Sequence, residues 1–370
     1  MAEIRLRLLG RFQVRRCGEE IPPASFGGRK VRTLLRVLAM RSPDLVPHQI
    51  LAEALWPDRL RARDPRGAAA LAELALVEAG QDGAQRAVAL ETASILDMNL
   101  GRPERARDRA EEALALHRAH GDARGVARIL DGRAMATFLD GRISEGVEVL
   151  GRVARMFSDA GELLRVVTPR STAGHGLVFL ARPADGLAET NEALQLAREL
   201  DAPEGQAYAL WHRSEALSGL GRGEEAEVDA REALRIALAV AHRGWTATAH
   251  RALGIALQVQ GRCDDAAAEF DASAGVAGDT LGLFASWAAA RSASVAVALG
   301  ALDEAADAVR RALALGPPLG HYEARLAQVE LAAARGGDDV PALASAALAA
   351  ARAGGHLVSV PRLAELASCG

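Results

Sequence analysis

The sequence has very little cysteine and only one lysine, Lys30. Its three cysteines, Cys17, Cys263 and Cys369, are widely spaced and form no CxxC pair. This argues against a disulfide framework and against a structural zinc site, and it favours a reducing compartment. The nine histidines are scattered without the spacing of metal ligands. We therefore expect neither a metal nor a cofactor.

Long apolar runs are also missing. Each longer apolar stretch is interrupted by Arg, Asp or Gly, well short of the roughly 20 residues that span a bilayer. The N-terminus has no charged segment followed by an apolar one, the pattern of a secretory signal. We expect a soluble, cytoplasmic protein without a membrane partner.

The motifs of the common enzyme classes are absent as well. A phosphate-binding loop needs GxxxxGK followed by Ser or Thr, and Lys30 stands instead in GGRKV. No HExxH, GxSxG or GxGxxG occurs in a suitable context. We expect no catalytic activity.

The composition indicates a helical protein. Half of the 370 residues are hydrophobic and 25% are charged, whereas aromatic residues make up only 4%. Abundant Ala and Leu favour helices that pack closely through small side chains over a β-rich core. The length allows two or three domains.

Charge is distributed unevenly along the chain. Residues 1–66 hold 14 Arg or Lys against 7 Asp or Glu, a net charge of +7, and the remainder carries −11. A basic segment joined to an acidic body fits a nucleic-acid contact at one end, because phosphate neutralisation supplies the sequence-independent part of affinity. The alternative is a solvated, arginine-rich surface.

The first residues show three elements in a defined order. Ile4, Leu6 and Leu8 alternate with Arg5 and Arg7, which predicts a half-buried antiparallel hairpin. Apolar residues at helical spacing then predict helices over 29–40 and 47–56, the second of which ends before a proline.

This order resembles the OmpR-like winged-helix domain of the SARP-type transcriptional regulators, on the segments RLLGRFQV, GGRK and LAEALWPD. The resemblance covers about residues 3–66 and implies a small α+β domain over residues 1–66. It also implies that basic residues near the first helix and after the second contact DNA or RNA polymerase. These residues are Arg29, Lys30, Arg32, Arg59, Arg61, Arg63 and Arg66.

The part of a winged helix that reads base sequence is not evident. The slot for the third helix, residues 66–79, offers Ala, Leu, Val and Glu where base contacts need Arg, Lys, Asn or Gln. No strand pair follows it. This segment could be the third helix of a truncated winged helix, the first helix of the next region, or both, and we take residues 67–84 as a bridging helix and loop.

The rest of the chain, residues 85–370, is repetitive. Turn segments such as GRISEG and GRGEEA begin at Gly101, Gly141, Ala181, Gly221, Gly261 and Gly300, about 40 residues apart. Small residues stand at fixed offsets around each turn, as expected where two helices cross closely. A degraded unit follows from His321, and residues 358–367 could form a capping helix.

These offsets resemble the tetratricopeptide repeat, with longer helices as in MalT-type regulators, and imply a helical solenoid. In that family the first helix of each unit lines a partner-binding groove. The corresponding positions are Arg128, Asp131, Met135, Ser171, His175, Tyr208, Trp211, Glu215, Arg251, Gln258 and Trp287. Aromatic and arginine residues there could hold a peptide; alternatively, the tryptophans only fill space between helices.

Together these patterns favour a transcriptional regulator in which a DNA-binding-like head precedes a solenoid that binds a protein or peptide partner. The alternative is an interaction scaffold or peptide receptor that does not bind DNA and whose head is a remnant. Homo-oligomerisation is compatible with either hypothesis.

Overall fold

The computed structural model describes residues 4–7, 13–16, 19–21, 65–80, 82–99, 102–278 and 281–368. They fall into two compact units, Met1–Leu116 and His117–Gly370. The predicted DNA contacts from Arg29 to Arg63 lie outside the described residues, and only the backbone of Arg66 is described, within a helix. The domain boundaries at residues 66 and 84 and the winged-helix assignment therefore stay predictions.

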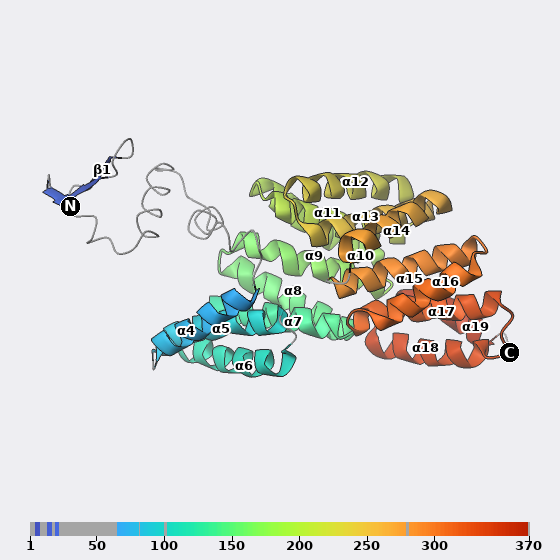
Figure 1. Cartoon of the computed structure of the whole chain (residues 1–370), viewed down its shortest axis with the longest axis horizontal. Helices are drawn as coiled ribbons and strands as arrows, with labels where there is room; N and C mark the ends of the chain where they lie inside the picture. Colours follow the sequence, from blue (N-terminus) through green and yellow to red (C-terminus); the bar gives the residue numbers. More distant parts are fainter. Residues whose placement is uncertain are drawn as a thin grey trace. The chain divides into compact units, whose positions relative to one another are not determined.

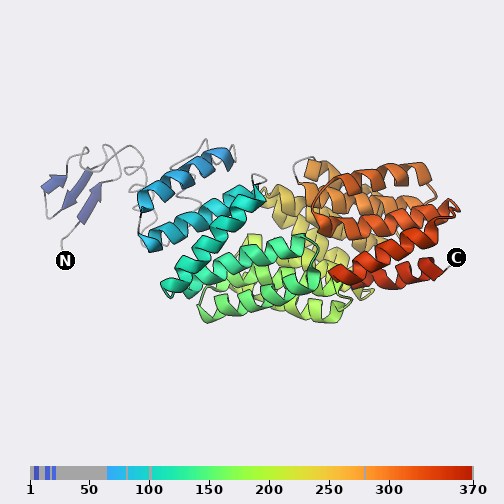
Figure 2. The same ribbon diagram turned by 90° about the horizontal axis from the view of Figure 1, so that it is seen from below.

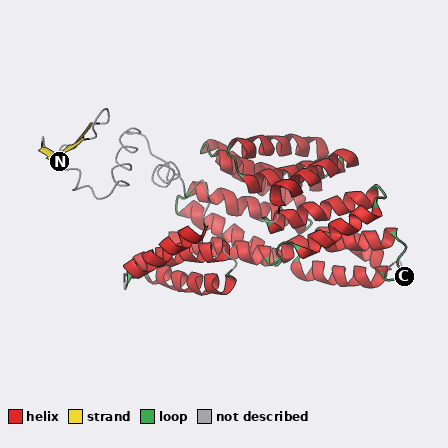
Figure 3. Ribbon diagram, in the orientation of Figure 1, coloured by secondary structure: helices red, strands yellow, loops and turns green. Residues whose placement is uncertain are grey.

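The first unit begins with three short strands, which Figure 3 shows in yellow. β1 (Ile4–Arg7), β2 (Gln13–Arg16) and β3 (Glu19–Ile21) form one antiparallel sheet in chain order, with Leu6 opposite Val14. The antiparallel hairpin predicted from the alternating pattern is confirmed for β1 and β2.

Three helices follow the strands in this unit. They are α4 (Pro65–Ala79), α5 (Gly83–Asn99) and α6 (Pro103–Ala119). α4 packs along α5 and buries Ala72 and Ala79, which favours the interpretation of residues 66–79 as a helix of the solenoid type. The fully buried carboxylate of Asp97 ties α5 to α6 through Arg105 at 2.8 Å and Arg109 at 2.7 Å.

The second unit consists of helix pairs that follow one another along the chain (Figure 1). Its α-helices are α7 (Ala123–Leu139), α8 (Ile143–Asp159), α9 (Leu163–Phe179), α10 (Pro183–Glu199), α11 (Pro203–Gly219), α12 (Gly223–Ala239), α13 (Arg243–Val259), α14 (Cys263–Ala277), α15 (Gly282–Ala298), α16 (Leu302–Ala314), α17 (His321–Ala334), α18 (Val340–Gly354) and α19 (Val360–Ser368). Two short 3₁₀ helices, η3 (Pro318–Gly320) and η4 (Leu357–Ser359), precede α17 and α19.

The turns explain the 40-residue period. From α7 to α13 each helix has 17 residues and each connection has three, so two helices and two turns fill one period. Every predicted turn residue from position 141 onward adopts the left-handed conformation, with φ of +81° at Gly141 and +57° at Ala181. Glycine is favoured there because it has no side chain to clash, so Ala181 carries some strain.

Small residues allow the helices of a pair to cross closely, as the sequence predicts. A Cβ atom added to Gly174 would lie 2.9 Å from the carbonyl oxygen of Gly186, and one added to Gly186 would lie 2.5 Å from that of Gly174. Similarly, a Cβ on Gly254 would lie 2.6 Å from the Phe270 ring. The predicted helical solenoid is confirmed, including the final pair α17–α18 and the terminal helix α19.

The last helices of the second unit contact its first helices. The hydroxyl of Tyr322 in α17 donates to the carbonyl oxygen of Gly141, 2.9 Å away and 181 positions earlier. η3 contacts α7, and η4 contacts α9. In two views the helices coloured green lie beside those coloured red (Figure 1 and Figure 2). We call this contact between α7–α9 and α17–α19 the seam.

Candidate binding interior

The predicted groove residues all lie on alternate helices that pack against one another. Each helix in the series α9, α11, α13, α15 and α17 contacts the next one in that series. Together with α7 we call them the inner helices. α7 carries Arg128, Asp131 and Met135; α9 carries Ser171 and His175; α11 carries Tyr208, Trp211 and Glu215; α13 carries Arg251 and Gln258; α15 carries Trp287.

Many of these side chains are covered, whereas the sequence predicts a groove surface. Arg251 is 1% exposed, Trp287 2% and Trp211 3%. Ser171, His175 and Glu215 are also buried, whereas Arg128, Asp131, Met135, Tyr208 and Gln258 are partly exposed. The inner faces meet because α17–α19 return to α7–α9, a closure that the repeat pattern does not predict.

A buried ion-pair network lies among the inner helices. Arg251 is paired with Glu215 through Nη1, and its Nη2 donates to both carboxylate oxygens of Glu323, at 3.0 and 2.9 Å. Arg291 also donates to Glu323, at 2.6 Å. The second oxygen of Glu215 is 2.8 Å from Nε2 of His175. These five residues form the interior cluster.

The charges in this cluster stabilise one another against the cost of burial. Burial alone raises a carboxyl pKa, but the Arg251 guanidinium and His175 hold the pKa of Glu215 at about 2. The pKa of Glu323 is likewise held well below its usual range, mainly by Arg251 and Arg291. Burial would lower the pKa of Arg251, yet the two carboxylates raise it above its ordinary value. Glu215, Glu323 and Arg251 are therefore ionised at neutral pH.

Aromatic rings surround the cluster. The Arg251 guanidinium lies 4.7 Å from the centre of the Trp287 ring, a cation–π contact. The His175 ring lies 5.1 Å from Trp211 and 5.7 Å from Trp287, edge to face. His175 is therefore a packed side chain paired with Glu215.

Two further histidines are buried beside the cluster. Burial lowers the pKa of His356, next to η4, to about 4, although the Glu323 charge opposes this. Burial, followed by the charge of His175, lowers the pKa of His212 well below its usual value. Both rings are neutral at pH 7, so closure adds no further positive charge to the interior.

The rim of the interior has polar groups of its own. Burial raises the pKa of Asp131 to about 6, a shift that Arg165 only partly offsets. Burial also raises the pKa of Tyr208 to about 12, and its hydroxyl lies 2.9 Å from that of Thr172. Oδ1 of Asp131 has no hydrogen-bond partner among the described residues.

The sequence reasoning missed Arg291, Glu323 and His356. Glu323 belongs to the degraded unit, where the 40-residue period no longer marks the inner positions. A different spacing could have identified it: Glu215 and Arg251 are 36 positions apart, and Arg251 and Glu323 are 72 apart. A separation of 36 is four residues, or about one helical turn, shorter than the 40-residue repeat. Residues that lie one turn earlier in each successive repeat therefore direct their side chains at the same centre.

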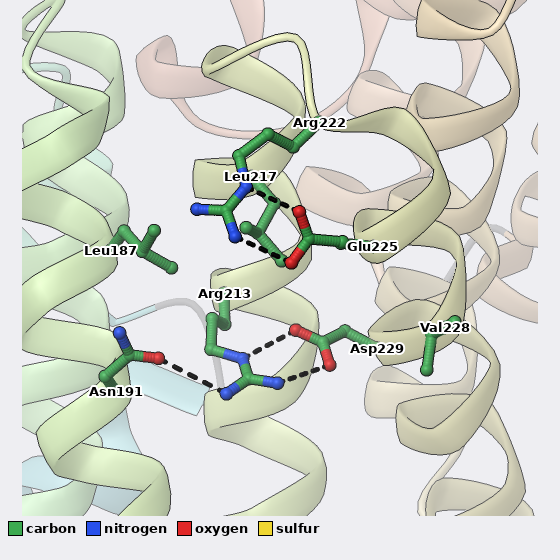
Figure 4. Close-up of a pocket in the computed structure, with 8 residues that line it drawn as sticks. All are labelled: Leu187, Asn191, Arg213, Leu217, Arg222, Glu225, Val228 and Asp229. Atoms are coloured by element: carbon green, nitrogen blue, oxygen red, sulfur yellow. Dashed lines mark hydrogen bonds and ion pairs between the residues drawn. The ribbon is translucent and has the colours of Figure 1, made fainter.

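α11 also borders a second candidate site, on its other side. A pocket of about 290 Å³ lies among α10, α11 and α12 (Figure 4). Arg213 donates to both oxygens of Asp229, each at 2.6 Å, and to Asn191 at 3.2 Å, while Arg222 is paired with Glu225. Its charged side chains pair with one another, so the pocket offers little to a polar ligand.

Neither a metal site nor a membrane span is found in the described part of the chain. No three His, Cys, Asp or Glu side chains come together there in a way that could hold a metal ion. No helix there is long and apolar enough to cross a membrane.

Comparisons with known proteins identify the fold. No family model matches the chain, and no curated protein matches it significantly. Among solved structures it is similar to a Rap protein in complex with competence and sporulation factor, with a TM-score of 0.60 and 13% identity over 84% of this chain and 94% of that one. It also matches yeast Tom70, with a TM-score of 0.42 and 14% identity over 92% of this chain and 64% of the other.

A third match is a STAND protein with a tetratricopeptide-repeat sensor, PH0952 from Pyrococcus horikoshii. The TM-score is 0.46, with 15% identity over 91% of this chain and 53% of that one. The helical body of the chain is a solenoid of the tetratricopeptide type.

Proposed function

We propose that this chain is a peptide or protein receptor whose inner helices bind the partner. The observation that carries the proposal is the concentration of polar and aromatic side chains on the inner helices. Arg251, Trp211 and Trp287 are of the residue types that dominate binding energy at interfaces. A core built only for stability needs no buried charge network, because well-packed apolar residues do as well or better.

The fold supports this proposal. The similar Rap protein was solved in complex with competence and sporulation factor, so a solenoid of this type can hold a ligand. The outer pocket at Arg213 is a weaker candidate, because its charged groups are already paired.

The proposal is tested by affinity selection with the full chain. Pools of random hexapeptides are incubated with the protein, and bound peptides are identified by mass spectrometry after gel filtration. Hydrogen exchange then maps the binding site. We expect bound peptide to slow exchange in α11, α13 and α15 more than in the outer helices α12 and α14. Slower exchange confined to the outer helices would contradict the proposal.

A second function rests on the basic opening segment. The +7 charge of residues 1–66 and the resemblance to SARP-type regulators support contact of the head with DNA or RNA polymerase, and hence transcriptional regulation. Fluorescence anisotropy with promoter DNA at several salt concentrations tests this function. Absence of binding by the full chain at low salt would exclude direct DNA contact and favour a non-DNA-binding receptor.

A further inference from the structure

The buried hydroxyls of Ser171 in α9 and Ser218 in α11 have no hydrogen-bond partner among the described residues, and neither do four buried N–H donors around the interior cluster. The four donors are Nε of Arg251, Nε of Arg291, and Nε1 of Trp211 and Trp287. A buried donor without a partner costs roughly 1–3 kcal/mol. These four donors therefore lack acceptors.

Both oxygens of each carboxylate in the cluster already have a hydrogen-bond partner. Glu215 uses one oxygen for Arg251 and the other for His175. Glu323 accepts from Arg251 with both oxygens and from Arg291 with one. A ligand that satisfies the four free donors must bring acceptors of its own.

Glu323 and Glu215 reach Arg251 from different parts of the chain. Glu215 and Arg251 lie on neighbouring inner helices, α11 and α13, whereas Glu323 reaches Arg251 from α17, beyond α15. α17 also carries Tyr322, whose hydroxyl bonds to Gly141 across the seam. The Glu323 carboxylate is therefore placed on Arg251 by the same helix that closes the interior.

We infer that the ligand of this interior is a peptide that brings a carboxylate to Arg251 and Arg291, in the place that Glu323 fills in the closed structure. The inference rests on the proposed function and names the chemical class of its ligand. Guanidinium groups bind carboxylates through paired N–H donors, so a side-chain or C-terminal carboxylate fits both arginines. The carbonyl groups of the peptide provide acceptors for the two tryptophans.

A basic peptide fits less well. It would bring more N–H donors to a site that already has four without partners. It would also have to displace Arg251, which is 1% exposed and bonded to two carboxylates. Releasing Glu323 instead leaves Arg251 and Arg291 facing only Glu215, which gives the site a net positive charge.

Entry requires the seam to part. Its contacts include close approaches of glycines: a Cβ on Gly354 would lie 2.6 Å from the carbonyl oxygen of Gly141, and one on Gly355 would lie 2.7 Å from Oγ of Ser144. The hydroxyl of Tyr322 in α17 donates a hydrogen bond to the carbonyl oxygen of Gly141, which lies in the turn between α7 and α8. Opening at the seam breaks this hydrogen bond and the ring contact between Phe179 and His356, whose centres lie 4.9 Å apart, and ligand binding then depends on the fraction of open molecules.

The experiment uses the full chain and three hexapeptide pools of equal length. One pool contains Asp and Glu with free C-termini, the second replaces each carboxylate by its amide, and the third contains Lys and Arg with amidated C-termini. We expect retained peptides to come from the acidic pool. The amide counterpart of a retained peptide should bind at least about tenfold more weakly, the effect of losing one charged hydrogen bond.

Variants then test the place of Glu323. Glu323→Gln should bind the same acidic peptide about tenfold more tightly, because the internal competitor is gone. Glu330→Gln, on the same helix, is the matched control and should stay within about twofold of the parent. Should Glu323→Gln not fold, Tyr322→Phe replaces it, with about threefold faster association expected from a looser seam.

Two results would overturn the inference. Retained peptides from the neutral or basic pool, whose affinity does not depend on a carboxylate, would exclude this ligand class but keep the receptor function. Retention of no peptide from any pool would remove the proposed function and the inference together. An unchanged affinity in Glu323→Gln, or unchanged association in Tyr322→Phe, would show that Glu323 and the seam do not compete with the ligand.

Discussion

The interior cluster and the outer pocket are both built from arginine–carboxylate pairs, but only the interior cluster is surrounded by buried N–H donors that have no acceptor. In the outer pocket, Arg222 pairs with Glu225 at the surface, and Arg213 pairs with the largely buried Asp229, 16 positions later. In the interior, Arg251 is 1% exposed and unites residues 36 and 72 positions away, while N–H donors around it stay without acceptors. Surface pairs contribute little and need no ligand, whereas a buried network with spare donors is costly unless it serves binding.

The largest difference between the two regions should appear when an arginine is removed. Arg251→Met leaves Glu215 and Glu323 buried without their main counter-charge, so we expect a loss of about 3–5 kcal/mol in the free energy of unfolding. Arg222→Met removes an exposed pair with Glu225 and should leave the free energy of unfolding almost unchanged. Urea unfolding followed by circular dichroism measures both. Equal losses would show that the interior cluster is no more buried in solution than the surface pair.

Acid should weaken the interior before it affects the surface. The folded-state pKa of His356 is lowered from 6.5 to about 4 by burial, opposed by Glu323 and reinforced by the charges of Arg291, Arg251 and His175. A depressed histidine pKa means that the unfolded chain binds the proton first, so this stability is present above pH 6.5 and is lost as pH falls towards 4.

Between pH 7 and pH 4.5 this effect amounts to about 2 kcal/mol. His356→Asn removes the titrating ring, and its stability should fall less than that of the parent over the same range. Unfolding curves at half-unit pH steps provide the measurement. Parallel pH profiles for the two proteins would mean that His356 is hydrated and that the seam is open.

At the rim, Asp131 should show a smaller effect of the opposite pH direction. Burial raises the pKa of Asp131 from 3.8 to about 6. Above pH 6 its buried negative charge therefore destabilises the folded protein, whereas below pH 4 the carboxyl is neutral in both states and has no such effect. Asp131→Asn should therefore stabilise the chain at pH 8 by roughly 1–2 kcal/mol, with the gain vanishing near pH 4. Thermal unfolding at the two pH values tests this; a gain independent of pH would exclude charge burial as the cause.

The sequence predicts the solenoid well because its determinants are local. Left-handed residues at Gly141 and Ala181 and the small pair Gly174 and Gly186 act within one repeat, so a period of 40 residues is enough to locate the helices. Closure depends instead on small rotations summed over several repeats. No local pattern encodes that sum, and the contact of Tyr322 with Gly141 was therefore not predicted.

The inner residues were predicted in part for a similar reason. Counting from each turn identifies Glu215, Arg251 and Trp287, because their units keep the regular period. Glu323 and His356 follow Gly300, where the unit is degraded and the count has no reference point. The predicted contacts of the head, from Arg29 to Arg63, stay predictions, because they lie outside the described residues.

The most direct test of the account is whether a bound peptide reaches the inner tryptophans. The chain has four tryptophans, and Trp56→Phe with Trp245→Phe leaves only Trp211 and Trp287. Titration with a selected acidic peptide should change the emission of this variant, with the same midpoint as calorimetry. Full binding by calorimetry without any change in that emission would contradict it, because the peptide would then bind elsewhere.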